Sequence, residues 1–282
     1  MYVADCGVQF DRRIGTRRYS APGRTLPSLY VRETRSKTYG SPIPMPELHY
    51  LDEARLNALD AEYFQTREPF PWINPEALLT PDAFQTLYST LPDISLFEKN
   101  FGKARKFGQQ SHDRYSLDYR PDLPLADHWH AFISELNGPH GQRFFCRMLG
   151  VRSVVLSCHW HYTPNGCSVS PHCDAKRKLG SQIFYFNTAD DWGPSWGGET
   201  LILSSDKPLK PDSAPSLDDF GHIIASEAVG NRSLLFARTD HSWHAVREIN
   251  APPDALRKVF ILVIEAGGLA SRLHRLIGKG GY

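Results

Sequence analysis

Apolar residues recur at helical spacing between residues 75 and 150 of the chain. The stretch Thr80-Pro81-Asp82 has the features of a helix start: an N-cap residue, a proline at the first helical position and an acid in the first turn. Apolar residues then follow at i, i+3, i+4 and i+7, namely Phe84, Leu87, Tyr88 and Leu91. Similar stripes over 129–136 and 144–149 predict two more amphipathic helices, and we expect all three stripes to be core faces.

The periodicity changes after residue 152. Six short runs rich in β-branched and aromatic residues, separated by turn clusters, predict strands: SVVLSCHWHY, QIFYFN, ETLILS, RSLLFA, HAVREI and RKVFILVIE. Several short strands at this spacing are typical of a sandwich or barrel. The sequence therefore predicts a mainly β protein with flanking helices, in which helices come first and an all-β core follows.

The pattern also suggests boundaries. The first fifty residues are rich in Arg, Pro, Gly and Ser and have little periodicity, so we expect an extended or partly disordered N-terminal arm over residues 1–67. Residues 68–150 are expected to form a helical buttress and residues 151–268 the β core. A basic C-terminal tail is expected over residues 269–282.

Charge and cysteine content narrow the function classes. The 282 residues include 32 Lys and Arg against 31 Asp and Glu, so net charge gives no reason to expect nucleic acid or a membrane as a partner. The sequence has no signal-peptide pattern and no apolar stretch long enough to span a bilayer, which favours a cytoplasmic protein. Five cysteines without a regular framework indicate reduced thiols, and a zinc site at Cys158, Cys167 and Cys173 is the disfavoured alternative.

A pair of potential metal ligands stands in His172-Cys173-Asp174. Residues two apart on a strand end point to the same side, so His172 and Asp174 can share a metal. The segment FARTDHSWHAV offers a third ligand in His241 or His244, and we favour His244 because it directly precedes a predicted strand. Two histidines and one carboxylate form the facial triad that holds non-haem Fe(II) with open coordination positions.

Motifs around these ligands occur in a recognisable order. YTPNG precedes HCD, IFYFN follows it, and then come Trp192, WGGETLIL, GNRSLLF, SWHAV and LRKVFILVI. In this order and spacing, residues 160–265 resemble the catalytic core of the Fe(II)- and 2-oxoglutarate-dependent dioxygenases. The resemblance is closest to the prolyl-4-hydroxylase-like group, including the prolyl hydroxylases that act on hypoxia factors. It implies a double-stranded β-helix, that is, a jelly-roll or cupin-like barrel, buttressed by the N-terminal helices.

The resemblance also implies roles for individual residues. His172, Asp174 and His244 match the iron ligands, and Asp174 favours hydroxylation or a related oxidation over halide transfer. Arg257 matches the basic residue that binds the far carboxylate of 2-oxoglutarate. Lys258 would take that role if the register slips in the long NAPPDA loop.

Two tyrosines complete the expected cosubstrate site. Tyr185 matches a position that hydrogen-bonds the same carboxylate, and Tyr162 is expected to line the pocket near the metal. The adjacent Gly197 and Gly198 suggest a bulge or tight turn at a strand start. We expect the DAKRKLG loop to be solvated, and the polar segment Lys99–Tyr119 to border the substrate.

The implied activity is hydroxylation of an unactivated C–H bond with release of succinate and CO2. Fe(II), 2-oxoglutarate and O2 would be required, with ascorbate as an optional stimulant. A small metabolite, amino-acid-like or a natural product, is the favoured substrate, and a prolyl-type residue of a protein or peptide is the alternative. A non-catalytic cupin-like metal-binding barrel is a further alternative, which Arg257 and Tyr185 disfavour because such a barrel needs no carboxylate anchor.

Overall fold

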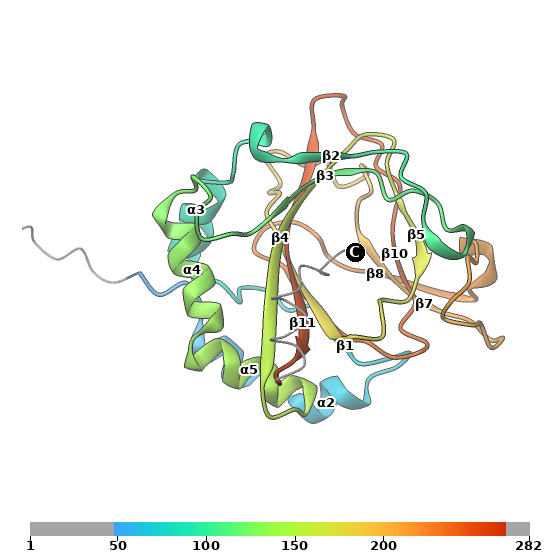
Figure 1. Cartoon of the computed structure of the whole chain (residues 1–282), viewed down its shortest axis with the longest axis horizontal. Helices are drawn as coiled ribbons and strands as arrows, with labels where there is room; N and C mark the ends of the chain where they lie inside the picture. The colour runs from blue at the N-terminus through green and yellow to red at the C-terminus, as the bar shows by residue number, and fades with distance from the viewer. Residues whose placement is uncertain (1–47, 269–282) are drawn as a thin grey trace, which may run out of the picture. The chain divides into compact units, whose positions relative to one another are not determined.

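Two antiparallel β-sheets and five α-helices make up the part of the protein that this computed structural model describes, residues 48–268. The predicted arm up to residue 47 and the tail from residue 269 lie outside the described residues. The sheets and helices are arranged in layers, with the helices against one face of the larger sheet (Figure 1).

The larger sheet has seven strands in the order β1-β9-β6-β11-β4-β3-β2. Its bounds are β1 Trp72–Ile73, β2 Glu98–Asn100, β3 Arg114–Asp118, β4 Val154–Pro164, β6 Lys178–Tyr185, β9 Ser233–Ala237 and β11 Leu256–Ala266. β4 and β11 pair along their whole length, from Leu256 opposite Pro164 to Ala266 opposite Val154. The helices and the candidate site both pack against this long ladder.

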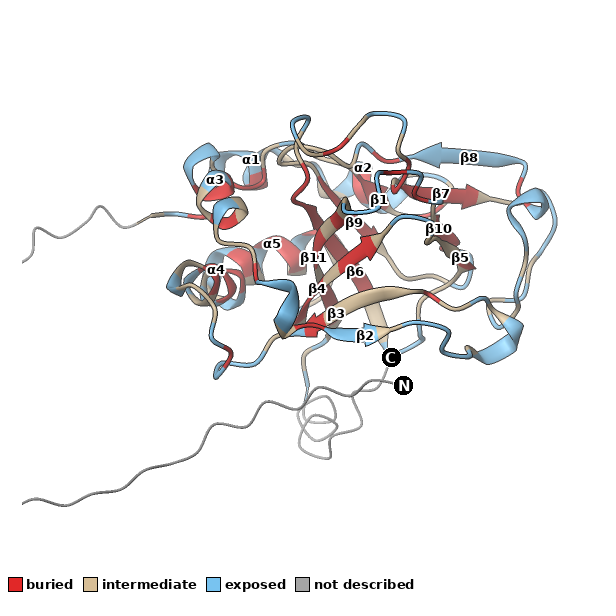
Figure 2. Cartoon of the chain, turned by 90° about the horizontal axis from the view of Figure 1, so that it is seen from above, coloured by how far each residue is buried: buried red, intermediate tan, exposed pale blue. Residues whose placement is uncertain are grey.

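The smaller sheet has four strands in the order β5-β10-β7-β8. Its bounds are β5 Val169–His172, β7 Thr200–Ser204, β8 His222–Ala225 and β10 His244–Val246. Figure 2 shows this sheet on the side of the larger sheet that is away from helices α3, α4 and α5. From β4 to β11, consecutive strands alternate between the sheets, except that β7 and β8 both belong to the smaller sheet.

The three helices predicted from periodicity are confirmed. They are α3 Pro81–Ser89, α4 Asp127–Asn137 and α5 Pro139–Leu149. The Thr80 side chain accepts a hydrogen bond from the Ala83 backbone N–H at 3.3 Å, as an N-cap does. Gly150 ends α5 in the left-handed conformation, with φ of 65°. Short 3-10 turns follow at Ile94–Leu96, Lys106–Gly108 and Leu217–Asp219.

Two expectations about the N-terminal half are wrong. Residues 53–66 are not part of an extended arm but form the helices α1 Glu53–Ala58 and α2 Ala61–Thr66. Asp52 and Asp60 cap these helices. Each helix buries only one apolar side chain, so its sequence shows no apolar periodicity. The segment 68–150 is not purely helical either, because β1, β2 and β3 join the larger sheet.

The main core lies between the helices and the larger sheet. Trp129 and Phe132 of α4 are fully buried and contact Phe260 of β11, with ring centroids 5.3 and 5.6 Å apart. Trp160 of β4 packs edge-on against Trp129 at 5.1 Å. Since neighbouring residues of a strand point to opposite faces, the residues beside Trp160 and Phe260 face away from the helices and toward the smaller sheet.

The α4–α5 junction depends on a close backbone approach at Gly141. A Cβ atom at this position would lie 2.2 Å from the Leu136 carbonyl oxygen. Gly141→Ala is therefore expected to destabilise the protein by about 1–3 kcal/mol, the usual cost of overpacking. Urea unfolding monitored by circular dichroism measures this. Gly268→Ala, at a position with no atom within 4 Å of the added Cβ, is the control, and equal stability of the two variants would contradict the expectation.

Among the described residues, no helix has the length and apolar character needed to cross a membrane.

Candidate metal centre and cosubstrate pocket

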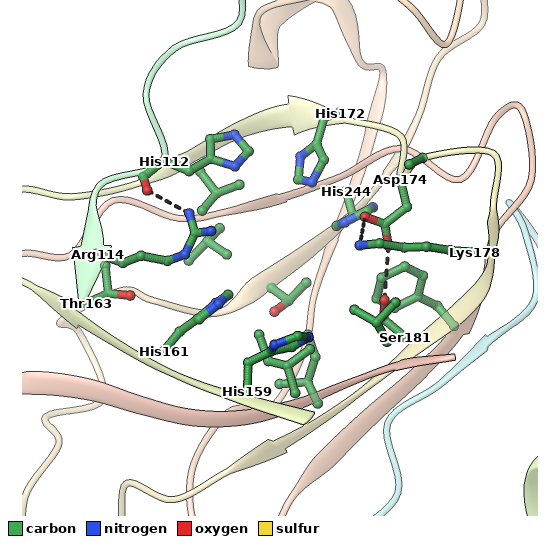
Figure 3. Close-up of a pocket in the computed structure, with 18 of the residues that line it drawn as sticks. His112, Arg114, His159, His161, Thr163, His172, Asp174, Lys178, Ser181 and His244 are labelled. Atoms are coloured by element: carbon green, nitrogen blue, oxygen red, sulfur yellow. Dashed lines mark hydrogen bonds and ion pairs between the residues drawn. The ribbon is translucent and has the colours of Figure 1, made fainter. Parts of the chain in front are cut away.

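The three predicted metal ligands meet in one cavity, which is lined by side chains of both sheets. His172 ends β5 and His244 begins β10, and these two residues pair directly across the smaller sheet. Asp174 follows β5 by two residues. The potential ligand atoms of the three residues all lie within 4.8 Å of one another, and the two imidazole centroids are 4.3 Å apart (Figure 3). His241, the alternative third ligand, is exposed in the preceding turn and does not join this group.

The tautomer of both histidines suits a metal. His172 Nδ1 lies 2.9 Å from the Ser170 carbonyl oxygen, and His244 Nδ1 lies 3.0 Å from the Ser242 carbonyl oxygen. A carbonyl only accepts, so each Nδ1 carries the proton and each Nε2 keeps its lone pair for a metal. Burial lowers the pKa of both imidazoles, which keeps them neutral and able to ligate.

The carboxylate ligand is oriented by two side chains of the next strand. Lys178 Nζ contacts Asp174 Oδ1 at 2.7 Å, and the Ser181 hydroxyl donates to Asp174 Oδ2 at 3.0 Å. Burial alone would raise the pKa of the Asp174 carboxyl, but the Lys178 ammonium, which also donates a hydrogen bond to it, outweighs burial and holds the pKa well below its usual range. The carboxylate is therefore ionised at any physiological pH. The expectation of a solvated DAKRKLG loop is wrong at Lys178, whose side chain is only 11% exposed.

Arg257 lines the same cavity as the three ligands. The residue is 6% exposed, and its guanidinium donates to the Gly198 carbonyl and, at 3.4 Å, to the Thr200 hydroxyl. Among the described residues, no carboxylate forms an ion pair with it. Burial lowers the pKa of this guanidinium, but arginine stays charged in proteins. A buried cation without a counter-ion is costly, so the cavity is suited to an anion.

Tyr185 belongs to the polar cluster around Arg257. Its hydroxyl donates to Thr200 Oγ1 at 2.9 Å and lies 3.0 Å from Ser226 Oγ, and its ring centroid is 5.6 Å from the Arg257 guanidinium carbon. Thr200, which lines the cavity, thus connects the tyrosine to the arginine. Sequence reasoning did not select Thr200 or Ser226, since isolated hydroxyl residues carry no pattern.

The two adjacent glycines are structural, as expected, and Gly198 also makes room for Arg257. Both have positive φ, 77° for Gly197 and 82° for Gly198. A Cβ at Gly198 would lie 3.0 Å from Arg257 Cδ, and a Cβ at Gly197 would lie 2.1 Å from the Glu248 carbonyl oxygen. Glycine at 198 therefore allows the arginine side chain to pass close to the backbone.

Strand alternation separates Arg257 from its neighbour. Lys258 points to the other face of β11, where Nζ contacts Asp191 Oδ2 at 2.9 Å, and it does not line the metal cavity. The prediction that Tyr162 lines the pocket is wrong for the same reason. Tyr162 faces the helices, with its ring stacked on Phe97 at 4.2 Å and its hydroxyl donating to the Pro92 carbonyl.

An imidazole-rich wall was missed in the sequence. His159, His161 and Thr163 alternate with buried apolar residues along β4 and line the cavity (Figure 3). The polar–apolar alternation of HWHYT was the signal that could have identified them. Residues Arg105, His112 and Arg114, from the segment expected to border the substrate, also line the cavity.

His112 gives the metal-free protein a pH dependence that can be measured. Burial, with Arg105 and Arg114 nearby, lowers the pKa of His112 to about 3, so the unfolded chain binds its proton first as pH falls. Between the unfolded value of roughly 6.5 and the folded value, this residue alone should cost about 1.4 kcal/mol of stability per pH unit of acidification. The stability of His112→Gln relative to wild type should therefore rise from pH 6 to pH 5 in urea unfolding. A constant difference would contradict the expectation.

The four cysteines within residues 48–268 contribute no ligand to this group. Cys146, Cys158, Cys167 and Cys173 are free thiols, and Cys6 lies outside the described residues. In the described part of the chain, the one group of three or more potential ligands is His172, Asp174 and His244, so the zinc–thiolate alternative finds no site there.

Comparisons with known proteins support the fold. No protein-family model matches the sequence, and a search of curated proteins also found no match. Among solved structures, a prolyl-4-hydroxylase from Pseudomonas putida superposes with a TM-score of 0.54 at 15% identity, over 77% of this chain and 100% of that chain. A Trichoplax adhaerens prolyl hydroxylase, solved with a fragment of hypoxia inducible factor, gives 0.53 at 15% identity over 80% and 94%.

A third neighbour comes from nogalamycin biosynthesis. It is SnoK, a non-heme alpha-ketoglutarate-dependent carbocyclase from nogalamycin biosynthesis, with a TM-score of 0.53 at 12% identity over 78% of this chain and 92% of that chain. Proteins with this architecture thus include a hydroxylase solved with a peptide fragment and an enzyme of nogalamycin biosynthesis. The chain has the double-stranded β-helix fold of the prolyl-hydroxylase-like 2-oxoglutarate oxygenases, as its sequence predicted.

Proposed function

We propose that this protein is an Fe(II)- and 2-oxoglutarate-dependent oxygenase that hydroxylates an unactivated C–H bond. The observation that carries the proposal is a buried arginine, Arg257, that forms no ion pair with any carboxylate among residues 48–268 and shares a cavity with two histidines and a carboxylate. A metal-binding barrel without turnover needs the ligands but not the arginine. An oxygenase that binds a dicarboxylate beside its metal needs both.

The donor set fits iron. Two neutral imidazoles with free Nε2 atoms and one ionised carboxylate are the ligands of non-haem Fe(II) oxygenases, and three ligands leave positions open. Iron held by His172, Asp174 and His244 would supply the oxidation of the substrate by O2, coupled to decarboxylation of 2-oxoglutarate to succinate. The other side chains hold this centre, since Lys178 and Ser181 fix the carboxylate and two backbone carbonyls fix the imidazoles.

The chain's own residues would bind and orient the cosubstrate. Arg257 offers its planar guanidinium to the far carboxylate, which neutralises a charge that is otherwise buried alone. Tyr185 and Thr200 hold the guanidinium and supply hydroxyl groups beside it. The apolar side chains of Ile183, Ile261 and Val263 line the floor of the cavity and exclude water from the reacting groups.

A small metabolite is the substrate class that we favour. The cavity is lined by side chains from both sheets and from the loop before β3, which suits a molecule enclosed on several sides. A prolyl-type residue of a protein or peptide is the second candidate, favoured by the structural likeness to a hydroxylase solved with a peptide.

An anaerobic titration tests the proposal. Metal-free protein is loaded with Fe(II), 2-oxoglutarate is added, and visible absorbance is recorded. A weak charge-transfer band that saturates with 2-oxoglutarate is expected, because the keto acid must chelate the metal. Succinate release on admitting O2 then measures turnover. Fe(II) binding without such a band would overturn the oxygenase and leave the binding barrel as the better account.

A further inference from the structure

The two sheets have four edge strands among the described residues, and three of these carry features that hinder pairing with another chain. β2 contains the charged residues Glu98 and Lys99, β5 contains Pro171, and β1 is only two residues long and follows Pro71. Charges, prolines and short length are the usual protection of an edge. The fourth edge strand, β8, has the sequence HIIA, with no acidic residue, lysine, arginine or proline.

β8 is an apolar strand on the outside of the molecule. Figure 2 shows it in pale blue along its length, at the outer edge of the smaller sheet. All four residues are exposed, with Ile223 at 45% and Ile224 at 42%. Ile224 lies opposite Ile202, which packs with side chains of the larger sheet, and Ile223 lies opposite Leu203, on the other face. Each face of this edge therefore presents a branched apolar side chain to water.

The ladder between β7 and β8 shows which backbone groups of β8 point outward. The Ser226 N–H donates to the Thr200 carbonyl at 2.9 Å, in the same register as the pairs of β8 with β7. Hydrogen-bonded and non-hydrogen-bonded pairs alternate along an antiparallel ladder. Ile224 therefore bonds to β7, whereas the N–H and C=O groups of Ile223 and Ala225 point away from it.

The other side of β7 agrees with this assignment. The Leu203 N–H donates to the Trp243 carbonyl at 3.0 Å, so Leu203 directs its backbone groups toward β10 and not toward Ile223. Among residues 48–268, no strand pairs with the outer side of β8. The outward N–H and C=O groups form a short template for one more strand.

This template is complementary to itself. Ile223 and Ala225 lie on either side of Ile224, so an antiparallel copy related by a two-fold axis at Ile224 would pair Ile223 of each chain with Ala225 of the other. Each of these two pairs would exchange both N–H···O=C hydrogen bonds. The sizes also match, since the large Ile223 meets the small Ala225 and Ile224 meets its own equivalent. The strand has no acidic or basic chain residue that would repel its copy.

We propose that two copies of this chain associate through β8, which joins their smaller sheets into one continuous sheet of eight strands, four from each copy. The inference does not depend on the proposed function, because it uses no residue of the metal centre. A second copy is the occupant because the strand's own sequence supplies both the hydrogen-bond register and the size match. The short contact predicts a weak dimer that forms as protein concentration rises.

Sedimentation equilibrium of the full chain over a wide range of concentrations tests the proposal. A reversible equilibrium between monomer and dimer is expected, with the average mass rising as concentration increases. The mass of a monomer at every concentration would overturn the proposal and leave this edge for a strand of different sequence.

Two variants test whether the dimer forms at β8. Ile224→Lys would bring two ammonium groups opposite each other, so the dimer Kd should rise at least about tenfold. Ala225→Pro removes an outward N–H and keeps the bonds to β7, so it should also weaken the dimer. Ile94→Lys is the matched control, because Ile94 is 39% exposed and lies in a 3-10 turn outside β8.

The variants should differ from wild type in association and not in folding. Both changed residues are exposed, so urea unfolding midpoints of monomeric Ile224→Lys and Ala225→Pro should lie close to that of wild type. A wild-type dimer whose Kd is the same in Ile224→Lys and Ala225→Pro would mean that association occurs elsewhere, and would overturn the proposal.

Disulfide formation tests the register. In the two-fold dimer, cysteines introduced by Ile224→Cys form a non-hydrogen-bonded pair with Cα atoms about 4.5 Å apart, which a disulfide can span. Cysteines introduced by Ile223→Cys lie diagonally, about 7–8 Å apart, beyond that reach. Mild oxidation should therefore give a covalent dimer of Ile224→Cys on non-reducing gels, above the level of wild type and of Ile223→Cys. Equal cross-linking of the two variants, or none above wild type, would overturn the two-fold pairing.

Discussion

Asp174→Ala is expected to abolish turnover and to lower Fe(II) affinity by at least about 100-fold, since even loss of a residue that only orients a ligand costs 10–100-fold. Asp174 is the one carboxylate among the three potential ligands, so its removal takes away the negative charge that offsets the metal. Calorimetric titration with Fe(II) under anaerobic conditions measures the affinity. Asp240→Asn, which changes an exposed carboxylate paired with Arg238, should behave as wild type.

The same substitution should also reveal the Lys178 ion pair. Both partners are about 10% exposed, so Asp174→Ala leaves a buried ammonium without its anion. Loss of one partner of such a pair costs about 3–5 kcal/mol. The double variant Asp174→Ala with Lys178→Met should regain most of that stability in urea unfolding and still fail to bind Fe(II). Recovery of metal binding in the double variant would show that Asp174 is not a ligand.

Arg257→Gln is expected to raise the Kd for 2-oxoglutarate about 100-fold and to leave Fe(II) affinity unchanged. The guanidinium is buried and faces the cavity, so a carboxylate bound to it would be desolvated, and truncating one side of such a contact costs about 2–5 kcal/mol. Titration of the charge-transfer band measures the Kd. Arg257→Lys keeps the charge but not the planar guanidinium, so its Kd for 2-oxoglutarate should lie between those of wild type and Arg257→Gln.

Lys258→Gln is the matched control for that substitution. It removes a cation from the next residue of the same strand, but its side chain lies on the other face, against Asp191. The Kd for 2-oxoglutarate should not change in this variant. An effect of Lys258→Gln equal to that of Arg257→Gln would mean that the strand as a whole, and not the guanidinium, determines binding.

The sequence by itself determined the order of the elements and indicated the three candidate metal ligands. Apolar residues that repeat every 3.6 positions identified α3, α4 and α5, and runs of β-branched residues identified most core strands. Such long apolar patterns show directly which face of an element is buried. His172 and Asp174 are two residues apart, and residues this close in sequence stay close in the folded protein. His244 was selected because it opens a strand, and it now lies directly opposite His172.

The tertiary structure alone decided which side chains share the cavity. Tyr162 and His161 are adjacent in sequence, yet strand alternation sends the tyrosine to the helices and the histidine to the metal side. The sequence alone places Lys178 in a solvated loop, but in the structure β6 positions it against Asp174. Arg114 carries no motif, and the pairing of β3 with β4, and of β4 with β11, places it in this cavity with Arg257. Arg105 also carries no motif and reaches the cavity from the loop before β3. Contacts between distant strands depend on register and on which face is shared, and a linear pattern of polar residues contains neither.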